Sequence, residues 1–281
     1  MNKTDISTNT IKTRKRGGTV IGGKMRYEFA FSPNHGFLAC PDPLLSDCEL
    51  KISFDRTRAQ NSLIAQAEII EPPEDDYIEI KDCIAITEWV SSPKLRSYFD
   101  GIDNSPIIYH YDDCEVLIKN IPNTNTHIRF DNIRGGNVPD YMFAAVVPQQ
   151  CLSGDFERSS TSFYNHSVTE LNITLNGNSV NGYPLEAKNG CPVHAMQKFF
   201  DVTGRMYNIN SGESLSCTKF GYNFIWSHKF EAESTTQGWL GVEMKLSDGY
   251  TENNPMCLVL WIINSNALKI DKFHQIEKIN L

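Results

Sequence analysis

Short segments in which apolar and polar residues alternate with period two recur along most of this 281-residue chain. Tyr27–Phe31, Leu50–Phe54 and Tyr77–Ile86 are the early examples. Successive side chains of a strand point to opposite faces, so this spacing puts one face in a core and the other towards water. The connecting segments, such as Ser32–Gly36 and Glu71–Asp76, are rich in residues that favour turns and interrupt sheet ladders.

The second part of the chain continues this alternation and predicts a long series of strands. They are expected at residues 107–111, 115–119, 127–130, 142–147, 170–175, 220–228, 238–246 and 256–263. The last residues before Asn176-Gly177 run directly into a pair typical of a two-residue hairpin turn. Short helices are expected at residues 92–99 and 192–200, each with a proline in its first turn. Many short strands with almost no long helical period predict an all-β protein with a jelly-roll sandwich fold.

The charge of the chain argues against nucleic-acid binding over its whole surface. The formal net charge is −8, whereas phosphate contacts require a basic surface. The basic run Lys12–Arg16 is a local exception, which could contact nucleic acid weakly or act as a nuclear-import signal. We interpret it as part of a flexible, solvated tail, because chain termini are usually loose. No membrane association is expected, because the longest apolar run, Cys257–Ile263, is too short to cross a bilayer.

The eight cysteines are widely spaced, and none of them forms a Cys-x-x-Cys pair. This spacing argues against a zinc knuckle or a thioredoxin-like site. Two of them, Cys83 and Cys257, lie in apolar segments, which is typical of buried free thiols in a reducing compartment. The full set is Cys40, Cys48, Cys83, Cys114, Cys151, Cys191, Cys217 and Cys257.

Three segments superficially resemble chemical sites. Gly18–Met25 approaches a phosphate-binding loop, but Met25 replaces the hydroxyl residue and no apolar strand precedes it, so we interpret it as a flexible glycine linker. His110 lies near Asp112 and Asp113, although a lone histidine on a strand is more often packed or hydrogen-bonded than catalytic. The acidic segment Glu71–Asp76 lacks the regular alternate oxygens of a calcium loop and favours a solvated turn.

The chain contains neither a Gly-x-Ser-x-Gly elbow nor a His-Glu-x-x-His helix. We therefore predict no catalytic, cofactor-binding or metal-binding residues, no cofactor, and no enzymatic activity. Three tryptophans, Trp226, Trp239 and Trp261, lie in strongly apolar segments and are expected to be buried. A sugar-binding jelly roll would instead expose aromatic rings for stacking.

A set of motifs follows one another in a characteristic order along the chain. They are Leu44–Arg56, Gly154–Phe156, Ser162–His166, Leu171–Gly177, Tyr183–Glu186, Phe220–Phe224, Gly238–Met244, Leu258–Ile263 and Leu268–Asp271. This ordered set resembles the double jelly-roll major capsid proteins of Maverick/Polinton elements and adintoviruses. The resemblance covers about residues 40 to 275, and Ser162-Phe163-Tyr164 stands where that family has an asparagine-proline-phenylalanine segment.

The resemblance implies a capsid structural protein that forms homotrimeric capsomers. Its partners would be further copies of itself and other capsid subunits, such as a penton protein. Its location would be the virion, assembled in the host cytoplasm or nucleus. A jelly-roll module that binds carbohydrate or protein without catalysis is the alternative, which glycan binding rather than closed self-association would reveal.

The length of the chain predicts an incomplete first jelly roll. A jelly roll takes eight strands, and only the last strands of a first one fit before the second. We expect a flexible basic tail at residues 1–18, the C-terminal strands of a first jelly roll at 19–97 and a complete second jelly roll at 98–281. The chain would then be the C-terminal portion of such a protein, a split gene product or a degraded integrated copy. A chain carrying the missing N-terminal strands would be a further partner.

Overall fold

The structure is a computed structural model, and its chain divides into two compact units, Met1–Ala39 and Cys40–Leu281. The residues that the structure describes are 18–21, 24–27, 36–39, 43–44, 49–53, 80, 83–84, 90–101, 105–154, 163–187, 192–204, 220, 224–231, 237–273 and 275–280.

The first unit contains an antiparallel hairpin, formed by β1 (Gly18–Ile21) and β2 (Lys24–Tyr27), and the 3-10 helix η1 (Gly36–Ala39). Ile21 lies opposite Lys24 in this hairpin, so two residues connect its strands. The prediction of a flexible linker at Gly18–Met25 is therefore wrong for the described residues. The β-branched residues of β1 favour a strand, and a strand followed by a strand lacks the helix of a phosphate-binding loop.

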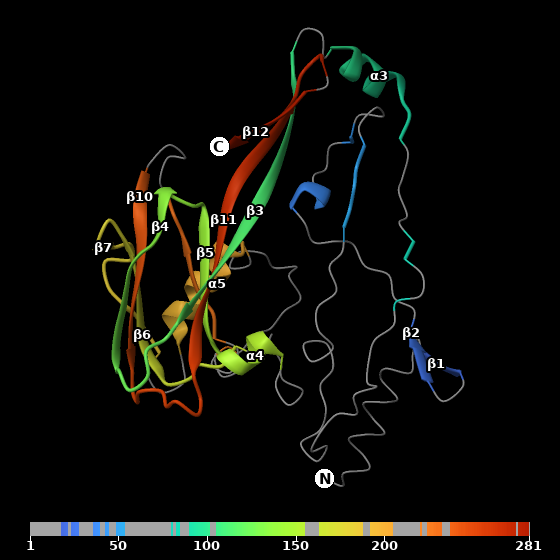
Figure 1. Ribbon diagram of the computed structural model, residues 1–281. Coiled ribbons are helices and arrows are strands. Elements are labelled where there is room, and N and C mark those ends of the chain that lie inside the picture. The colour runs from blue at the N-terminus through green and yellow to red at the C-terminus, as the bar shows by residue number, and fades with distance from the viewer. Residues whose placement is uncertain are drawn as a thin grey trace. The chain divides into compact units, whose positions relative to one another are not determined.

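The second unit is a sandwich of two antiparallel sheets with five strands each, which confirms the predicted jelly-roll class. Figure 1 labels its elements. They are α3 (Pro93–Asp100), β3 (Ile107–Asn120), β4 (His127–Asn137), β5 (Tyr141–Pro148), α4 (Gln149–Ser153), β6 (Val168–Leu175), β7 (Asn178–Ser179), β8 (Leu185–Glu186), α5 (Val193–Val202), β9 (Trp226–Lys229), β10 (Gln237–Leu246), β11 (Met256–Ile270) and β12 (Ile276–Asn280).

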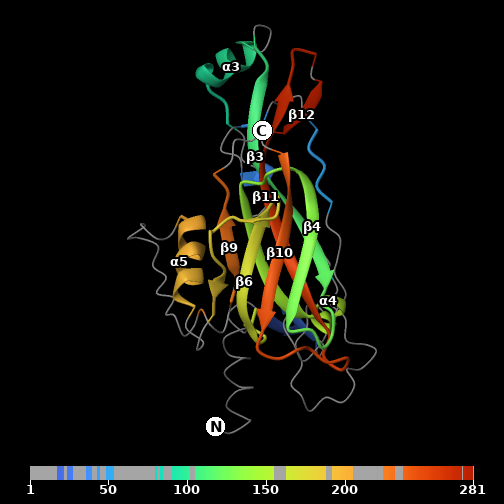
Figure 2. The same ribbon diagram turned by 90° about the vertical axis from the view of Figure 1, so that its left-hand side faces the viewer.

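The strand pairs are nested, which is the signature of a jelly roll. β3 pairs with β11, β4 with β10, β5 with β9 and β6 with β8, all of them antiparallel. The chain thus behaves as one long hairpin that is wrapped into two sheets. One sheet contains β3, β11, β5 and β9, with β12 added beside β11, and we call it the β11 sheet. The other contains β4, β10, β6, β7 and β8, and we call it the β10 sheet. Figure 2 shows this second sheet from its outer side.

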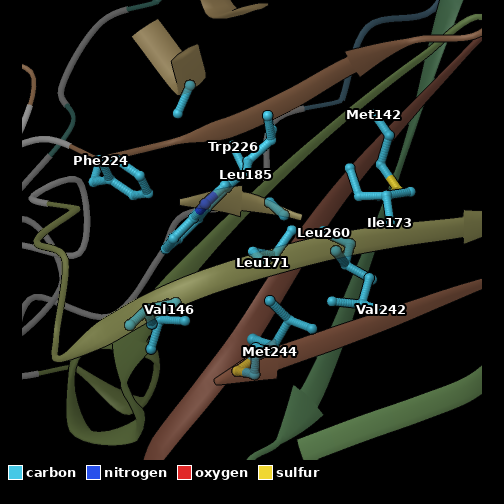
Figure 3. Packing of buried hydrophobic residues seen from close by; sticks show 14 of the residues in the cluster. Met142, Val146, Leu171, Ile173, Leu185, Phe224, Trp226, Val242, Met244 and Leu260 are labelled. Atoms are coloured by element: carbon cyan, nitrogen blue, oxygen red, sulfur yellow. The ribbon is translucent and has the colours of Figure 1, made fainter. Parts of the chain in front are cut away.

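The core lies between the two sheets and follows the alternation of their strands. Leu258, Leu260 and Ile262 of β11 point inward and are at most 1% exposed. Val242 and Met244 of β10 meet them from the other sheet, as Figure 3 shows for part of this cluster. Removing these apolar surfaces from water is the main favourable term in the folding of the unit.

Aromatic side chains close the side of the sandwich next to α5. The ring of Phe199 lies 5.6 Å from that of Phe220, which lies 5.6 Å from Phe224, which lies 4.0 Å from Trp226. The predicted strand at 220–228 is therefore wrong in part. A strand forms only from Trp226 onwards. Phe220 is helical and Phe224 lies outside helices and strands, so their apolar character reflects burial in the core and not a position in a sheet.

Most other predictions for the second part of the chain are confirmed. The expected helices are α3 and α5, and the side chain of Ser92 accepts a hydrogen bond from the backbone N–H of Leu95 at the start of α3. Asn176 and Gly177 have φ angles of 53° and 80°. A two-residue hairpin turn whose twist matches that of its strands requires positive φ at both positions. The two strands expected at 107–111 and 115–119 form the single strand β3, because β11 continues beside it through the polar residues between them. The short elements α4, β7, β8 and β12 had no clear sequence signal.

The strands predicted at Leu50–Phe54 and Tyr77–Ile86 are not observed at their described residues. Residues 49–53, 80, 83 and 84 lie outside helices and strands. Leu50 is 46% exposed, and Ile80 and Ile84 are 64% and 84% exposed. Alternation produces a buried face only where a second layer covers it, and among the described residues no strand pairs with these segments. For the predicted strand Tyr27–Phe31, only Tyr27 is described, and it ends β2.

The prediction of buried cysteines is confirmed for Cys257 and wrong for Cys83. Cys257 is 1% exposed, as predicted from its apolar strand, and Cys151 is also buried. Cys83 is exposed, which contradicts the prediction of a buried thiol. Its described apolar neighbour Ile84 is exposed as well, at 84%.

Gly249 permits a close backbone contact between the β10–β11 connection and the segment before β4. A Cβ atom at this position would lie 2.7 Å from the carbonyl carbon and oxygen of Thr124. We expect Gly249→Ala to lower the free energy of unfolding by about 1–3 kcal/mol, because backbone atoms cannot move aside cheaply. Urea denaturation would measure this. Gly101→Ala is the matched control, since no atom lies within 4 Å of its added Cβ. Equal stability of the two variants would contradict the prediction.

Candidate interaction face

The outer face of the β10 sheet is covered with charged and polar side chains. Lys245 Nζ lies 2.7 Å from Glu170 Oε2, and His127 Nε2 lies 2.6 Å from Glu243 Oε1. The hydrogen bond with His127 lowers the pKa of the Glu243 carboxyl below its ordinary value. These groups come from three neighbouring strands, and such polar contacts are compatible with water. This face therefore has the composition of a solvated surface.

The outer face of the β11 sheet is apolar instead. Val147 of β5 lies opposite Cys257 of β11, and both are 1% exposed. Val259 is 4% exposed beside them, and Leu152 and Phe163 pack against the same cluster. Since the inner face of β11 is also buried, this sheet has apolar residues on both of its sides. Such a sheet needs cover on each face, and α4 together with the segment of Phe163 supplies part of it.

Towards β3, the same outer face is less well covered. Val116 of β3 lies opposite Trp261, and Ile118 lies opposite Val259. Cross-strand partners share a face of the sheet, so Val116 and Ile118 extend the apolar cluster to the sheet edge. They are 50% and 51% exposed, while Trp261 is half-buried and packs edge-to-face on Phe163 with 5.4 Å between ring centres. We call Val116, Ile118 and Trp261 the β3 patch.

β3, β11 and β12 continue beyond the sandwich as a three-stranded ribbon, which Figure 1 shows. One face of the ribbon is covered, because Tyr109 is 1% exposed and its hydroxyl donates to the backbone oxygen of Pro43 at 3.1 Å. Its turn is exposed, with Phe273 at 72% and Ile276 at 63%. Asp271 Oδ1 holds this turn by accepting from the backbone N–H groups of Phe273 and Gln275, at 2.8 and 2.9 Å.

Arg134 ties the two sheets together where the ribbon begins. From β4, its Nε donates to Glu115 Oε2 of β3 at 3.0 Å, and its Nη2 donates to Asn264 Oδ1 of β11 at 3.2 Å. Its Nη1 donates to the backbone oxygen of Asn137 at 2.6 Å. The side chain is 19% exposed, so this is a partly buried, charge-assisted contact with a structural role.

The histidine and acids singled out in the sequence lie on β3, in the ribbon. His110 is exposed on the ribbon. Asp112 accepts from Ser265 Oγ at 3.3 Å, and Asp113 accepts from Lys278 Nζ at 2.8 Å. These acids therefore join the strands of the ribbon. Lys12–Arg16 and Glu71–Asp76 lie outside the described residues.

The part of the chain that the structure describes holds no cluster of three metal-ligating side chains. No helix among these residues is both long enough and apolar enough to cross a membrane.

The tryptophans divide between the core and the surface. Trp226 is fully buried and Trp261 is half-buried, but Trp239 is 52% exposed. The prediction of burial is wrong for Trp239 because Gly135 lies opposite it on β4 and offers no side chain to cover the ring. Its backbone N–H donates to Asn176 Oδ1 at 2.9 Å, which fixes this end of β10.

Comparison with known proteins finds similarity at the level of fold only. No protein-family model matches the chain, and no curated protein matches it. Among solved structures, the PBCV-1 virus capsid matches over 67% of this chain and 55% of that chain, with 10% identity and a TM-score of 0.40. A chain of the Sputnik virophage matches over 63% of this chain and 39% of that chain, with 14% identity and a TM-score of 0.39. The chain thus spans only about half the length of these structures, or less.

His228 is a titratable group inside the sandwich wall. It is 8% exposed on β9, and its Nδ1 lies 3.0 Å from Asn181 Oδ1. Burial, assisted by the positive charge of Lys198, lowers the pKa of His228 to about 4. The folded protein therefore keeps this imidazole neutral at pH values where an unfolded chain would protonate it.

We expect this histidine to make the unit less stable in mild acid. Above about pH 6.5 it is neutral in both states and has no effect. As the pH falls from about 6.5 towards 4, only the unfolded chain binds the proton, so stability falls by at most about 1.4 kcal/mol per pH unit. Denaturation curves should show a shallower loss over this window for His228→Gln than for wild type. His110→Gln, at an exposed histidine, should keep the wild-type slope, and equal slopes for all three proteins would refute the assignment.

Proposed function

We propose that the chain is a structural subunit of a viral or transposon-derived capsid. The observation that carries this proposal is the contrast between the two outer faces of a complete jelly roll. One face is charged and suited to water, and the other is apolar, with Val116 and Ile118 half exposed at the edge on β3. A shell subunit needs such a division, because it must bury part of its surface against neighbours while the rest stays solvated.

The sequence resemblance makes the proposal more specific. It favours a major capsid subunit of the Maverick/Polinton and adintovirus type, which forms homotrimeric capsomers and contacts other subunits such as a penton protein. The location would be the virion, with assembly in the host cytoplasm or nucleus. Residues 98–281 would be the second jelly roll, residues 19–97 the last strands of the first, and 1–18 a flexible tail. No catalytic role is assigned to any residue.

The exposed apolar residues of the early segments support the idea of an incomplete first jelly roll. Leu50 and Ile52 are 46% and 42% exposed, and Ile80 and Ile84 are exposed further still. Alternating segments of this kind would be covered if a second sheet lay against them. A chain that carries the missing strands would supply that sheet, and burial of each such side chain would contribute about 1.5–3 kcal/mol.

Sedimentation velocity and negative-stain microscopy of the full chain test the capsid proposal. We expect closed particles of three copies, each of 31.8 kDa, because capsid subunits form symmetric oligomers. The variant I80D/I84D should no longer form the three-copy particle, since charges would replace the apolar surface that a partner covers. Its melting temperature should stay near that of wild type, because both side chains are already exposed. I80V/I84V is the matched control and should assemble normally. The proposal would be refuted if the wild-type chain stays monomeric at all concentrations, both alone and when mixed with a chain that carries the missing strands.

The exposed ring of Trp239 favours a second candidate function, a carbohydrate-binding module. The ring projects from the charged face opposite Gly135, which has no side chain to cover it. If this function holds, a glycan array should show binding that Trp239→Ala abolishes and Trp239→Phe retains in part, because stacking needs an aromatic face. Binding that is unchanged in Trp239→Ala, or absent from the wild type, would exclude this candidate.

A further inference from the structure

β3 has one edge for which the structure describes no partner strand. Among the described residues, β3 pairs only with β11, along all of Ile107–Asn120. Fourteen residues make a long edge. Where a strand edge has no partner strand, its backbone N–H and C=O groups can pair with another strand. The half of β3 within the sandwich also carries the exposed Val116 and Ile118.

We infer that this edge is an interface for a second copy of the same chain, paired antiparallel about a two-fold axis at Leu117. Such an interface is isologous, so each contact occurs twice. In this register Cys114–Asn120 of one copy lies beside the same segment of the other. Val116 lies opposite Ile118 of the second copy, Glu115 opposite its Lys119, and Leu117 opposite its own equivalent.

The charges of β3 are complementary in this arrangement. Glu115 of each copy meets Lys119 of the other, which gives two opposite-charge cross-strand pairs. Glu115 already accepts from Arg134 through Oε2 at 3.0 Å. A carboxylate has acceptor sites on both oxygens, so it can bind Lys119 of the second copy without losing Arg134.

The alternation of β3 excludes the neighbouring registers. A shift that moves each residue's partner by one position places the exposed residues of one copy opposite the core-side residues of the other. A shift by two in one direction sets Leu117 against Glu115, and in the other direction sets it against Lys119. The register centred on Leu117 is therefore the one that matches both the apolar and the charged side chains.

This pairing also extends an apolar surface that already exists. Val116 and Ile118 border Trp261 and Val259 across the strand pair with β11. Two copies joined at β3 would bring four β-branched side chains together, next to the ring of Trp261 from each copy. The β3 patch of one copy would thus be covered by the β3 patch of the other, and the two β11 sheets would continue into each other.

The inference goes beyond the proposed capsid function and does not depend on it. A three-copy particle needs contacts around a three-fold axis, whereas the β3 interface has two-fold symmetry. In a shell, the β3 interface would join a subunit of one capsomer to a subunit of the next. The two ideas can therefore fail separately, because one concerns a species of three copies and the other an association in even numbers.

Charge-reversal variants of the full chain test the interface. In Lys119→Glu, two like-charge pairs replace the two attractive ones, so the concentration for half-association should rise about tenfold. Glu115→Lys should have the same effect. An equimolar mixture of the two variants should associate like the wild type, because each strand then meets the opposite charges. Sedimentation velocity over a concentration series would measure all four samples.

Two controls keep the result interpretable. Lys94→Glu makes the same change of charge on α3, outside the Cys114–Asn120 segment, and should associate like the wild type. Thermal melting should show that the variants are folded. Because Glu115→Lys removes the contact of Glu115 with Arg134, Ile118→Asp is added as a variant that keeps this contact, and it should also weaken association. Failure of the mixture to restore association would overturn the inference, as would wild-type association in odd numbers alone. Loss of even-numbered association with retention of a three-copy particle in Lys119→Glu would support both proposals.

Discussion

The hydrogen-bonding of β11 on both of its edges is the constraint on which the second unit depends. Its 15 residues pair with β3 along one edge, and with β5 and then β12 along the other. β11 is also the last strand of the nested series, and its partner β3 is the first. The two can pair only when the chain between them folds back so that its ends meet. The closing contact is thus between segments about 150 residues apart, and loop closure of this range makes jelly rolls slow to fold.

The composition of β11 follows from this central position. The run Met256–Leu260 is buried at every position, because α4 and Phe163 cover the outer face where the second sheet covers the inner one. Such a strand loses the simple alternation of a half-buried strand. Beyond Ile263 the polar residues Asn264–Asn266 mark the point where the strand leaves the sandwich and becomes part of the ribbon. One strand therefore changes its surroundings along its length without any break in its hydrogen bonds.

The sequence predicted the elements whose patterns depend only on local physics. Period-two alternation identified most strands of the sandwich, and the Asn176-Gly177 pair identified a turn that requires two positive φ angles. Predictions failed where a residue's surroundings come from distant parts of the chain. Phe220 and Phe224 are apolar because they fill the core from outside the sheets, and Trp239 is exposed because Gly135 lies opposite it. The contrast between the two outer faces likewise depends on strand order, which alternation along one strand does not reveal.

The two halves of β3 differ in the side chains that they carry along its edge. The ribbon half carries Asp112 and Asp113, and charged residues on an edge discourage pairing with other chains. Asp113 is also held by Lys278 at 2.8 Å, so it serves the ribbon itself. The sandwich half has a different composition, with Val116 and Ile118 exposed between Glu115 and Lys119. The acidic residues would prevent strand pairing with another copy from continuing into the ribbon half. In the sandwich half, the opposite charges of Glu115 and Lys119 would permit only one register of pairing. A long edge would in this way offer a short and specific site, with its limits set by the side chains of the strand.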